Sequence, residues 1–256
     1  MSETAVDVLT RQAAAYVRGR PDYPAEVEDW LRSELALGPG KIVLDLGSGT
    51  GKFLPRLLAT DAELIAIEPL AQMRSHLVAL HPGVEAIEGR AQAIPLANGS
   101  VDAVTCAQCF HLFATAEALQ EIRRVLKPGG ALGLLWNIRS SATPWVASIV
   151  EIMAPYEHRV PHIPHYESDR WKSAFPAKGF SELQKVRFDN PQTGSPENVI
   201  LDRVLSTYSI AKLPQAERDH IIDRLRDLIA ASPELAGKQT VSFPNDCHAY
   251  SCRKTE

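Results

Sequence analysis

From residue 40 to residue 137, apolar residues alternate between strand-like and helix-like spacing. Short apolar runs, typical of strands buried in a parallel sheet, are separated by segments whose apolar residues recur on one helical face. Strands that alternate with helices in this way predict an α/β fold, with a parallel sheet covered by helices on both faces. The predicted strands are 42–46, 64–67, 84–87, 101–107 and 131–136. The predicted helices are 51–60, 70–80 and a third whose apolar stripe ends at Leu126, before a Lys-Pro-Gly-Gly turn.

After Asn137 this alternation stops. We expect a further strand near 183–188, a helix that begins with Ser195 as N-cap and Pro196 at its first position, a second helix with an apolar stripe from Ile221 to Ile229, and a final strand pattern over 240–254. The predicted division is a core of 1–137, 176–190 and 237–256, with insertions at 138–175 and 191–236. In open parallel sheets such insertions lie above the carboxyl ends of the strands, where ligands bind.

Composition narrows the class of protein. The chain has 256 residues, a 45% apolar and a 23% charged fraction, and a net charge of -4. The length fits one domain, or one domain with a sub-domain, and the composition is ordinary for a globular protein and shows no general footprint of nucleic-acid binding. No apolar run approaches bilayer length, and the first residues carry no signal-peptide pattern, so we expect a cytoplasmic protein without a membrane partner.

Cysteine and histidine clusters raise the question of a metal. Cys106 and Cys109 form a C-x-x-C, which can be half a zinc site or a redox pair. They also fit as two small apolar residues of a buried strand, and this interpretation is favoured because no second C-x-x-C follows. His158, His162 and His165 are interrupted by prolines, so a loop that lines a ligand pocket is favoured over a metal site. We predict no metal.

The clearest chemical signal is the segment K-I-V-L-D-L-G-S-G-T-G-K at 41–52. A glycine-rich turn after a strand lets backbone approach a ligand closely. Lys52 stands where a dinucleotide fingerprint needs glycine, and Phe53 follows Lys52 where a phosphate loop needs Ser or Thr. A nucleoside ligand without a pyrophosphate fits better, and Glu68, at the end of the second strand, can accept both hydrogens of a ribose diol.

Several motifs in series carry a family resemblance. V-L-D-L-G-S-G-T-G-K, I-A-I-E-P, G-R-A-Q-A-I-P-L-A-N-G-S-V-D-A-V and L-K-P-G-G-A-L resemble the successive motifs of class I S-adenosylmethionine-dependent methyltransferases in order and spacing. The flanking Y-V-R-G-R-P-D-Y-P, A-Q-C-F-H-L-F, T-Y-S-I-A-K-L-P and V-S-F-P resemble the trans-aconitate methyltransferase-like group, which has a type 11 methyltransferase domain. The group often has His-Trp where this chain has His111-Leu112, so the acceptor pocket is expected to differ in shape.

The resemblance implies a Rossmann-like sheet of seven strands, mostly parallel with the last strand antiparallel, and a helical or loop cap from insertions after strands five and six. It implies S-adenosylmethionine as cofactor and S-adenosylhomocysteine as product. The residues it assigns to the cofactor are Tyr16, Arg20, Asp45, Gly47, Gly49, Thr50, Gly51, Glu68, Pro69, Met73, Ala91, Gln92 and Gln108.

Each part of the cofactor has its predicted partners. Asp45 and the glycines would shape the turn against the methionine part, while Glu68 would hold the ribose. Met73 would lie near the adenine, unless it is a core residue, and Ala91 and Gln92 would meet the adenine edge. Gln108 would line the sulfonium region. Tyr16 and Arg20 would close over the amino-acid end.

The acceptor is expected to be a small molecule that is methylated on oxygen or nitrogen. His111, just past the fourth strand, is the candidate catalytic residue, as a general base or as an orienting group; a structural histidine is the alternative. Aromatic residues suggest a pocket for a bulky acceptor, and Arg139 could hold an acid if the reaction is carboxyl O-methylation. The predicted acceptor-binding residues are Trp136, Arg139, Tyr156 and Tyr208.

Two other classes of function are weighed against this prediction. Methyltransferases that act on base amino groups usually carry a pattern like N/D-P-P-Y/F after strand four. This chain has A-Q-C-F at that position. A non-catalytic protein that only senses the cofactor would not need two insertions over its site. We therefore expect a small-molecule acceptor, no nucleic-acid partner, and a monomer or homodimer.

Overall fold

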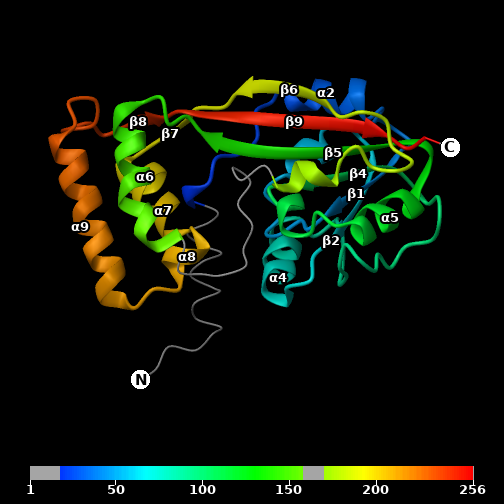
Figure 1. Ribbon diagram of the computed structural model, residues 1–256, viewed down its shortest axis with the longest axis horizontal. Coiled ribbons are helices and arrows are strands. Elements are labelled where there is room, and N and C mark those ends of the chain that lie inside the picture. Colours follow the sequence, from blue (N-terminus) through cyan, green and yellow to red (C-terminus); the bar gives the residue numbers. More distant parts are fainter. Residues whose placement is uncertain (1–17, 158–169, 256) are drawn as a thin grey trace. The chain divides into compact units, whose positions relative to one another are not determined.

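The computed structural model describes residues 18–157 and 170–255, and its central element is one seven-stranded sheet with the strand order β3-β2-β1-β4-β5-β9-β6. The strands β1 to β5 pair in parallel, whereas β9 runs in the opposite direction between β5 and β6 (Figure 1). This confirms the predicted Rossmann-like α/β sheet. The strands are β1 (Ile42–Leu46), β2 (Glu63–Ile67), β3 (Glu85–Ile87), β4 (Val101–Ala107), β5 (Leu126–Arg139), β6 (Gln184–Asp189) and β9 (Asn245–Arg253).

Side-chain alternation along the central strands gives the sheet two apolar faces. Val43 of β1 belongs to a buried cluster with Leu31 of α2 and Leu57 of α3, while the neighbouring Leu44, also fully buried, points to the opposite face. Strands that are apolar on both faces need cover on both, as the near-continuous apolar runs predicted. The α-helices between residues 23 and 137 are α2 (Val27–Glu34), α3 (Leu54–Leu58), α4 (Ala71–Leu80) and α5 (Ala116–Val125).

Two segments differ from the sequence prediction. Leu126 was expected to end a helix, but it begins β5 and pairs with Val101 before a register shift in β4. The helix expected after Ser195 is broken into a π-helical segment η4 (Glu197–Asp202), α7 (Arg203–Leu205) and α8 (Tyr208–Ala211). In both places the backbone hydrogen bonding that decides the element type was not visible in the sequence pattern.

Contacts divide the chain into two compact units. Among the described residues, the sheet unit consists of 23–137, 170–188 and 247–255, and the helical unit consists of 18–22, 138–157 and 189–246. The bounds differ from the predicted division for residues 18–22, 189–190 and 237–246, which group with the helical unit, and for residues 170–175, which group with the sheet unit.

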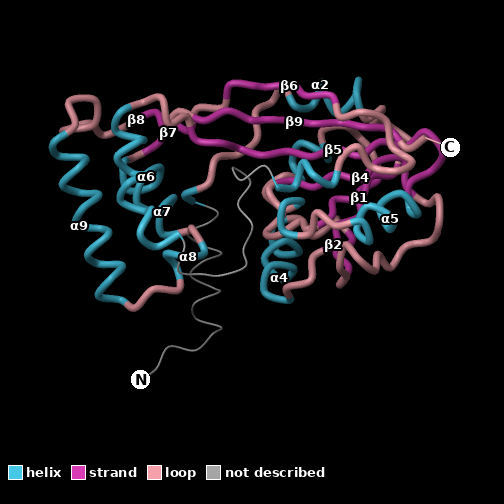
Figure 2. Tube along the Cα trace, viewed as in Figure 1, coloured by secondary structure: helices cyan, strands magenta, loops and turns pink. Residues whose placement is uncertain are grey.

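The helical unit has a core of its own. Helices α6 (Pro144–Glu157) and α9 (Gln215–Ala231) pack against each other, and β7 (Gln192–Gly194) pairs in antiparallel orientation with β8 (Val241–Phe243) (Figure 2). Trp145 and Phe243 meet edge to face at 5.1 Å between ring centroids. The helical unit therefore packs around an apolar core of its own, as a compact domain does.

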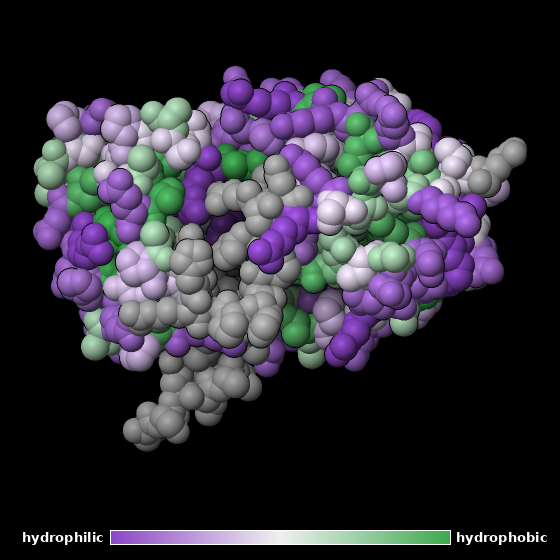
Figure 3. Space-filling view, viewed as in Figure 1, coloured by the Kyte–Doolittle hydropathy of each residue, from purple (hydrophilic) through white to green (hydrophobic). Residues whose placement is uncertain are grey.

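Hydrophilic side chains predominate on the face seen in Figure 3, with apolar residues between them. Among the described residues, none of the helices combines the length and the apolar character that crossing a bilayer requires.

Candidate active site

The glycine-rich turn leaves β1 at the point where the strand order reverses between β1 and β4. The backbone N–H groups of Gly47 and Ser48 both donate to the carbonyl of Ile67 at the end of β2, at 2.7 and 3.1 Å. The Ser48 hydroxyl donates to the Asp45 carbonyl at 2.7 Å. These bonds fix the turn at the carboxyl edge of the sheet, which is where open α/β sheets bind ligands.

The three glycines of the turn have positive φ angles but different surroundings. A Cβ on Gly47 would lie 2.9 Å from Cys109 Sγ, and one on Gly51 would lie 2.9 Å from His81 Cδ2. A Cβ on Gly49, whose φ is +58°, would meet no heavy atom of the described residues within 4 Å. Gly47 and Gly51 therefore allow close packing inside the protein, while Gly49 presents bare backbone to open space.

Glu68 connects the turn to the end of β2. Its Oε2 accepts the backbone N–H of Gly49 at 2.9 Å, and its Oε1 accepts that of Leu70 at 3.0 Å. The side chain is buried, and this burial raises the pKa of Glu68 more than the two N–H donors lower it. Each carboxylate oxygen keeps a second lone pair, so Glu68 can still accept hydrogen bonds from a ligand.

Asp45 lies beneath the turn. It faces Thr105 in the register of β1 and β4, and the Thr105 hydroxyl donates to Asp45 Oδ1 at 2.8 Å. Burial raises the pKa of Asp45 to about 6, and the nearby Glu68 carboxylate adds to the increase. The other oxygen, Oδ2, and the Thr50 hydroxyl are buried without a hydrogen-bond partner among the described residues. Unpaired buried acceptors of this kind are rare in proteins and fit a site that a polar or cationic ligand completes.

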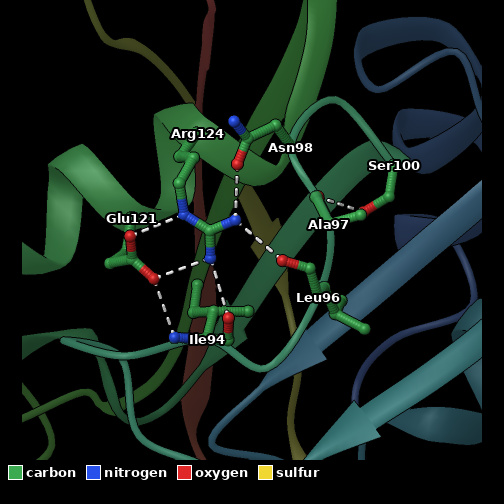
Figure 4. Close-up of polar contacts among 7 residues, drawn as sticks. All are labelled: Ile94, Leu96, Ala97, Asn98, Ser100, Glu121 and Arg124. Atoms are coloured by element: carbon green, nitrogen blue, oxygen red, sulfur yellow. Dashed lines mark hydrogen bonds and ion pairs between the residues drawn. The ribbon is translucent and has the colours of Figure 1, made fainter.

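The segment that follows Ala91 and Gln92 is held from α5, as Figure 4 shows for Ile94, Leu96 and Asn98. The Arg124 guanidinium donates to the carbonyls of Ile94 and Leu96, at 2.8 and 2.7 Å. It also pairs with the carboxylate of Glu121 on the same helix. Glu121 Oε2 in turn accepts the Ile94 backbone N–H at 2.9 Å. Ala91 is buried and Gln92 is exposed. A backbone contact from this segment thus has a rigid support.

Gln108 follows β4 and adopts a positive φ of 63°, which is uncommon for a residue with a side chain. Its backbone N–H donates to the Leu135 carbonyl at 2.8 Å, and its Nε2 donates to the Asn137 carbonyl at 3.0 Å. These bonds hold the residue against the carboxyl end of β5. Backbone in sparsely populated regions often accompanies a functional site.

His111 lies in the short helix η1 (Phe110–Leu112) directly after β4 and is half-buried. Its Nδ1 accepts the indole N–H of Trp136 at 3.1 Å. Trp136 is fully buried and packs on Trp171, with 4.5 Å between ring centroids. The role of Trp136 toward an acceptor stays a prediction, and its hydrogen bond with His111 is a contact that the sequence did not suggest.

The other predicted site residues occupy varied places. Met73 on α4 is half-buried and outside both apolar clusters, and Pro69 is exposed. Within the helical unit, Arg20 donates to the hydroxyls of Ser206 and Thr207 at 3.0 and 3.2 Å. Tyr16 lies outside the described residues, as does the side chain of Tyr208.

Two predicted acceptor-binding residues also belong to the helical unit. Arg139 lies near Met153, with 3.6 Å between Nη1 and Sδ, and Tyr156 is buried in the apolar core of that unit. Their roles toward an acceptor stay predictions.

No group of three or more potential metal ligands occurs in the described part of the chain. Cys106 and Cys109 are free and buried, and a hydrogen bond between the two thiols, together with burial, raises the pKa of Cys109. A thiol that resists ionisation is a poor zinc ligand. His158, His162 and His165 lie outside the described residues.

Sequence reasoning missed three residues that organise this site. Thr105 is the hydroxyl partner of Asp45, and a polar residue inside the apolar strand V-D-A-V-T-C-A was a usable signal. Arg74 donates to the carbonyls of Glu68 and Pro69 at 2.8 and 2.9 Å, from one turn into α4. Arg124 gave no signal beyond an ordinary charge on a helix, because its partners come from a distant loop.

Comparison with known proteins agrees with this geometry. Residues 44–134 match the methyltransferase domain family. An uncharacterized methyltransferase-like protein of Schizosaccharomyces pombe is 36% identical over 243 residues, covering 94% of this chain and 93% of that protein. A malonyl-[acyl-carrier protein] O-methyltransferase of Methylococcus capsulatus is 28% identical over 224 residues, covering 81% of this chain and 78% of that protein.

A solved structure shares the fold. A type II methyltransferase candidate from Anaeromyxobacter dehalogenans superposes with a TM-score of 0.63 at 22% identity, covering 93% of this chain and 97% of that chain. The narrower resemblance to the trans-aconitate methyltransferase-like group stays a prediction. The match over nearly the whole length of a relative, together with the domain match and the shared fold, identifies the chain as a member of the class I S-adenosylmethionine-dependent methyltransferases.

Proposed function

We propose that the protein binds S-adenosylmethionine at the Gly47–Gly51 turn and transfers its methyl group to a small-molecule acceptor. The observation that carries this proposal is the pair of buried carboxylates, Asp45 and Glu68, beside the turn. An acidic turn disfavours the pyrophosphate of a dinucleotide and favours a ligand that carries positive charge. S-adenosylmethionine has an ammonium and a sulfonium group as well as a ribose.

The residues present fit such a ligand. The open space over Gly49 admits it, Glu68 has lone pairs left for the ribose hydroxyls, and the unpaired Asp45 Oδ2 offers an acceptor. We assign the adenine edge to the backbone of Ala91 and Gln92 and the sulfonium region to Gln108. Because Arg74 holds the backbone of Glu68 and Arg124 holds the segment that follows Gln92, little ordering entropy would be lost on binding.

When bound, the cofactor supplies a methyl group that is already activated as a sulfonium. The protein then has to align the acceptor and exclude water, and these effects can supply most of the acceleration. His111 is the described polar side chain that we assign to the acceptor side. With a net charge of -4, the chain fits a small-molecule acceptor better than a nucleic acid. We further propose a cytoplasmic enzyme that acts as a monomer or homodimer.

Carboxyl O-methylation is the second candidate function. The relative from Methylococcus capsulatus is named for O-methylation of a malonyl group, and its match covers most of this chain. A carboxylate acceptor is consistent with Arg139 as a residue for holding acids, which stays a proposal. N-methylation and O-methylation of other small molecules are the alternatives.

Isothermal titration calorimetry tests the cofactor. We expect S-adenosylmethionine and S-adenosylhomocysteine to bind with one site per chain and NAD to give no heat. Glu68→Ala should weaken this binding. Its matched control is Glu88→Gln, which removes an exposed carboxylate paired with Arg74 and leaves Glu68 intact. NAD that binds and is displaced by S-adenosylhomocysteine would contradict the proposal.

The acceptor is tested by a screen. The protein is incubated with S-adenosylmethionine labelled on its methyl group and with a metabolite library containing carboxylic acids, phenols, alcohols and amines. We expect label on one chemical class only. The same screen with the Glu68→Ala variant should give no labelled product, which separates enzymatic transfer from spontaneous methylation.

A further inference from the structure

The hydrogen bond between Trp136 and His111 fixes which nitrogen of the imidazole carries hydrogen. Trp136 Nε1 lies 3.1 Å from His111 Nδ1, and the ring centroids are 6.3 Å apart. An indole N–H can only donate, so Nδ1 must accept. In the neutral imidazole the hydrogen then sits on Nε2.

The surroundings of Trp136 keep this donor in place. The indole is fully buried, it packs on Trp171 at 4.5 Å between centroids, and Tyr250 meets it edge to face at 5.9 Å. A ring packed on two sides in a core cannot leave its rotamer without opening a cavity. The indole N–H therefore stays directed at His111.

We propose that His111 acts as an N–H donor toward the methyl acceptor and not as its general base, and that Trp136 is the positioning residue that sets this role. This inference rests on the proposed function. A general base needs a lone pair for the proton it takes up. On His111 the Nδ1 lone pair is used by Trp136, and Nε2 already carries its hydrogen.

The proposal has a consequence for the acceptor. A hydroxyl that takes a methyl group must lose its proton, and the proton then needs a base. An anionic oxygen that takes the methyl from a sulfonium gives a neutral ester or ether and a neutral thioether, with no proton left to place. An N–H donor pairs well with such an oxygen, through a charge-assisted hydrogen bond. We therefore assign to the site acceptors whose oxygen is anionic before transfer.

Nitrogen-15 NMR of the full-length protein with labelled histidine tests the tautomer directly, and His111→Asn assigns the signal. We expect Nδ1 to show the chemical shift of an unprotonated nitrogen and Nε2 that of an N–H. In Trp136→Phe, which removes the indole N–H and keeps an aromatic ring, the signal should move toward a mixture of tautomers. The matched control is Trp145→Phe, which removes an indole from the separate apolar core of the helical unit and should leave the tautomer unchanged.

A wild-type spectrum with the hydrogen on Nδ1 would overturn the proposal, even if Trp136→Phe does not fold. The acceptor found by the labelling screen provides the second measurement. An acid or an ionised phenol supports the proposal, and with it His111→Ala should lower kcat/KM about 10- to 100-fold, the effect of one hydrogen bond to a charged group. An un-ionised alcohol as acceptor contradicts it. A screen without any labelled product counts against the proposed function, whereas the NMR measurement still decides the tautomer.

Discussion

The Glu68 carboxylate accepts the backbone N–H of Gly49 at 2.9 Å, so the end of β2 holds the turn that follows β1 in its open shape. Glu68 therefore has two roles. Its carboxylate fixes the backbone of the turn, and the same carboxylate is the predicted acceptor for the ribose hydroxyls. A ligand that reaches Glu68 thus finds the carboxylate already oriented by the Gly49 and Leu70 N–H groups.

Glu68→Ala should therefore weaken S-adenosylhomocysteine binding in two ways, by loss of the ribose acceptor and by release of the turn. We expect an increase in Kd of at least about 10- to 100-fold, since each hydrogen bond to a charged group contributes about 1.5–3 kcal/mol. Calorimetry measures the change, with Glu88→Gln as the control at an exposed carboxylate. Unaltered affinity in Glu68→Ala would show that the ligand binds elsewhere.

Substitutions of the turn glycines should separate binding from folding. Gly49→Ala points a methyl group into space that the described residues leave open, so it should abolish ligand binding while costing only about 1–2 kcal/mol for the left-handed backbone. Gly51→Ala also places a side chain at a positive φ, +84°, and in addition drives its methyl group against His81 and Leu77. Thermal unfolding should show the larger loss of stability in Gly51→Ala. Equal unfolding temperatures for the two variants would contradict the assigned surroundings.

Much of the fold was predictable because its signals are local. The run Ile42–Leu46 and the run Val101–Ala107 have the predicted bounds, since buried parallel strands are short apolar segments that end at a turn or a polar residue. Glu68 was predictable for the same reason, because it follows such a strand directly. Leu126 was not, since its pairing with Val101 depends on a partner 25 residues away.

The arrangement around His111 could not be predicted from the sequence. His111 follows β4 and Trp136 belongs to β5, so their contact exists only because those strands are neighbours and because both side chains turn to the same side. Periodicity identifies Trp136 as an aromatic residue near the end of a strand, which fits a pocket wall and a buried support equally well. The contacts and the burial of such a residue are properties of the whole fold, which the local pattern does not contain.

Arg124 is expected to stabilise the loop before β4. Arg124→Ala removes bonds to the carbonyls of Ile94 and Leu96 and leaves Glu121 without its partner, so we expect a loss of about 1–3 kcal/mol in the free energy of unfolding. Hydrogen exchange should speed up at the Ile94 amide in particular. The control is Arg226→Ala on α9, whose ion pair with Asp223 is exposed at 3.8 Å and should contribute little. Equal losses in the two variants would argue against a supporting role for Arg124.

The four cysteines should be unreactive while the protein is folded. All are free and buried, and burial raises the pKa of Cys247 and of Cys252 to about 12. We expect Ellman's reagent to modify none of them rapidly in native protein and all four after denaturation.

EDTA should leave the melting temperature and the affinity for S-adenosylhomocysteine unchanged. Elemental analysis that finds about one zinc per chain, lost together with the fold on chelation, would overturn the prediction.

The ionised Asp45 carboxylate should lower the free energy of unfolding at neutral pH. Its pKa is raised from 3.8 to about 6 by burial, so between these values the folded chain binds more protons than the unfolded chain. The contribution of Asp45 to stability is thus fully present below about pH 4, is lost as the pH rises to about 6, and stays lost above it. The difference is on the order of 3 kcal/mol.

Asp45→Asn keeps the shape of the side chain and an acceptor for the Thr105 hydroxyl but removes the charge. We expect the stability of the variant relative to the wild type to rise by on the order of 3 kcal/mol as the pH goes from 4 to 7. The new amide N–H also needs a partner, and this lowers the stability of the variant by about 1–3 kcal/mol equally at both pH values. Its affinity for S-adenosylmethionine should fall, since the acceptor for a cationic group is gone. Urea unfolding at pH 4 and pH 7, with Asp246→Asn as the control at a half-buried carboxylate, measures the first effect. A stability difference between Asp45→Asn and the wild type that does not change with pH would mean that Asp45 titrates normally, and the acidic turn would then lose its main electrostatic support.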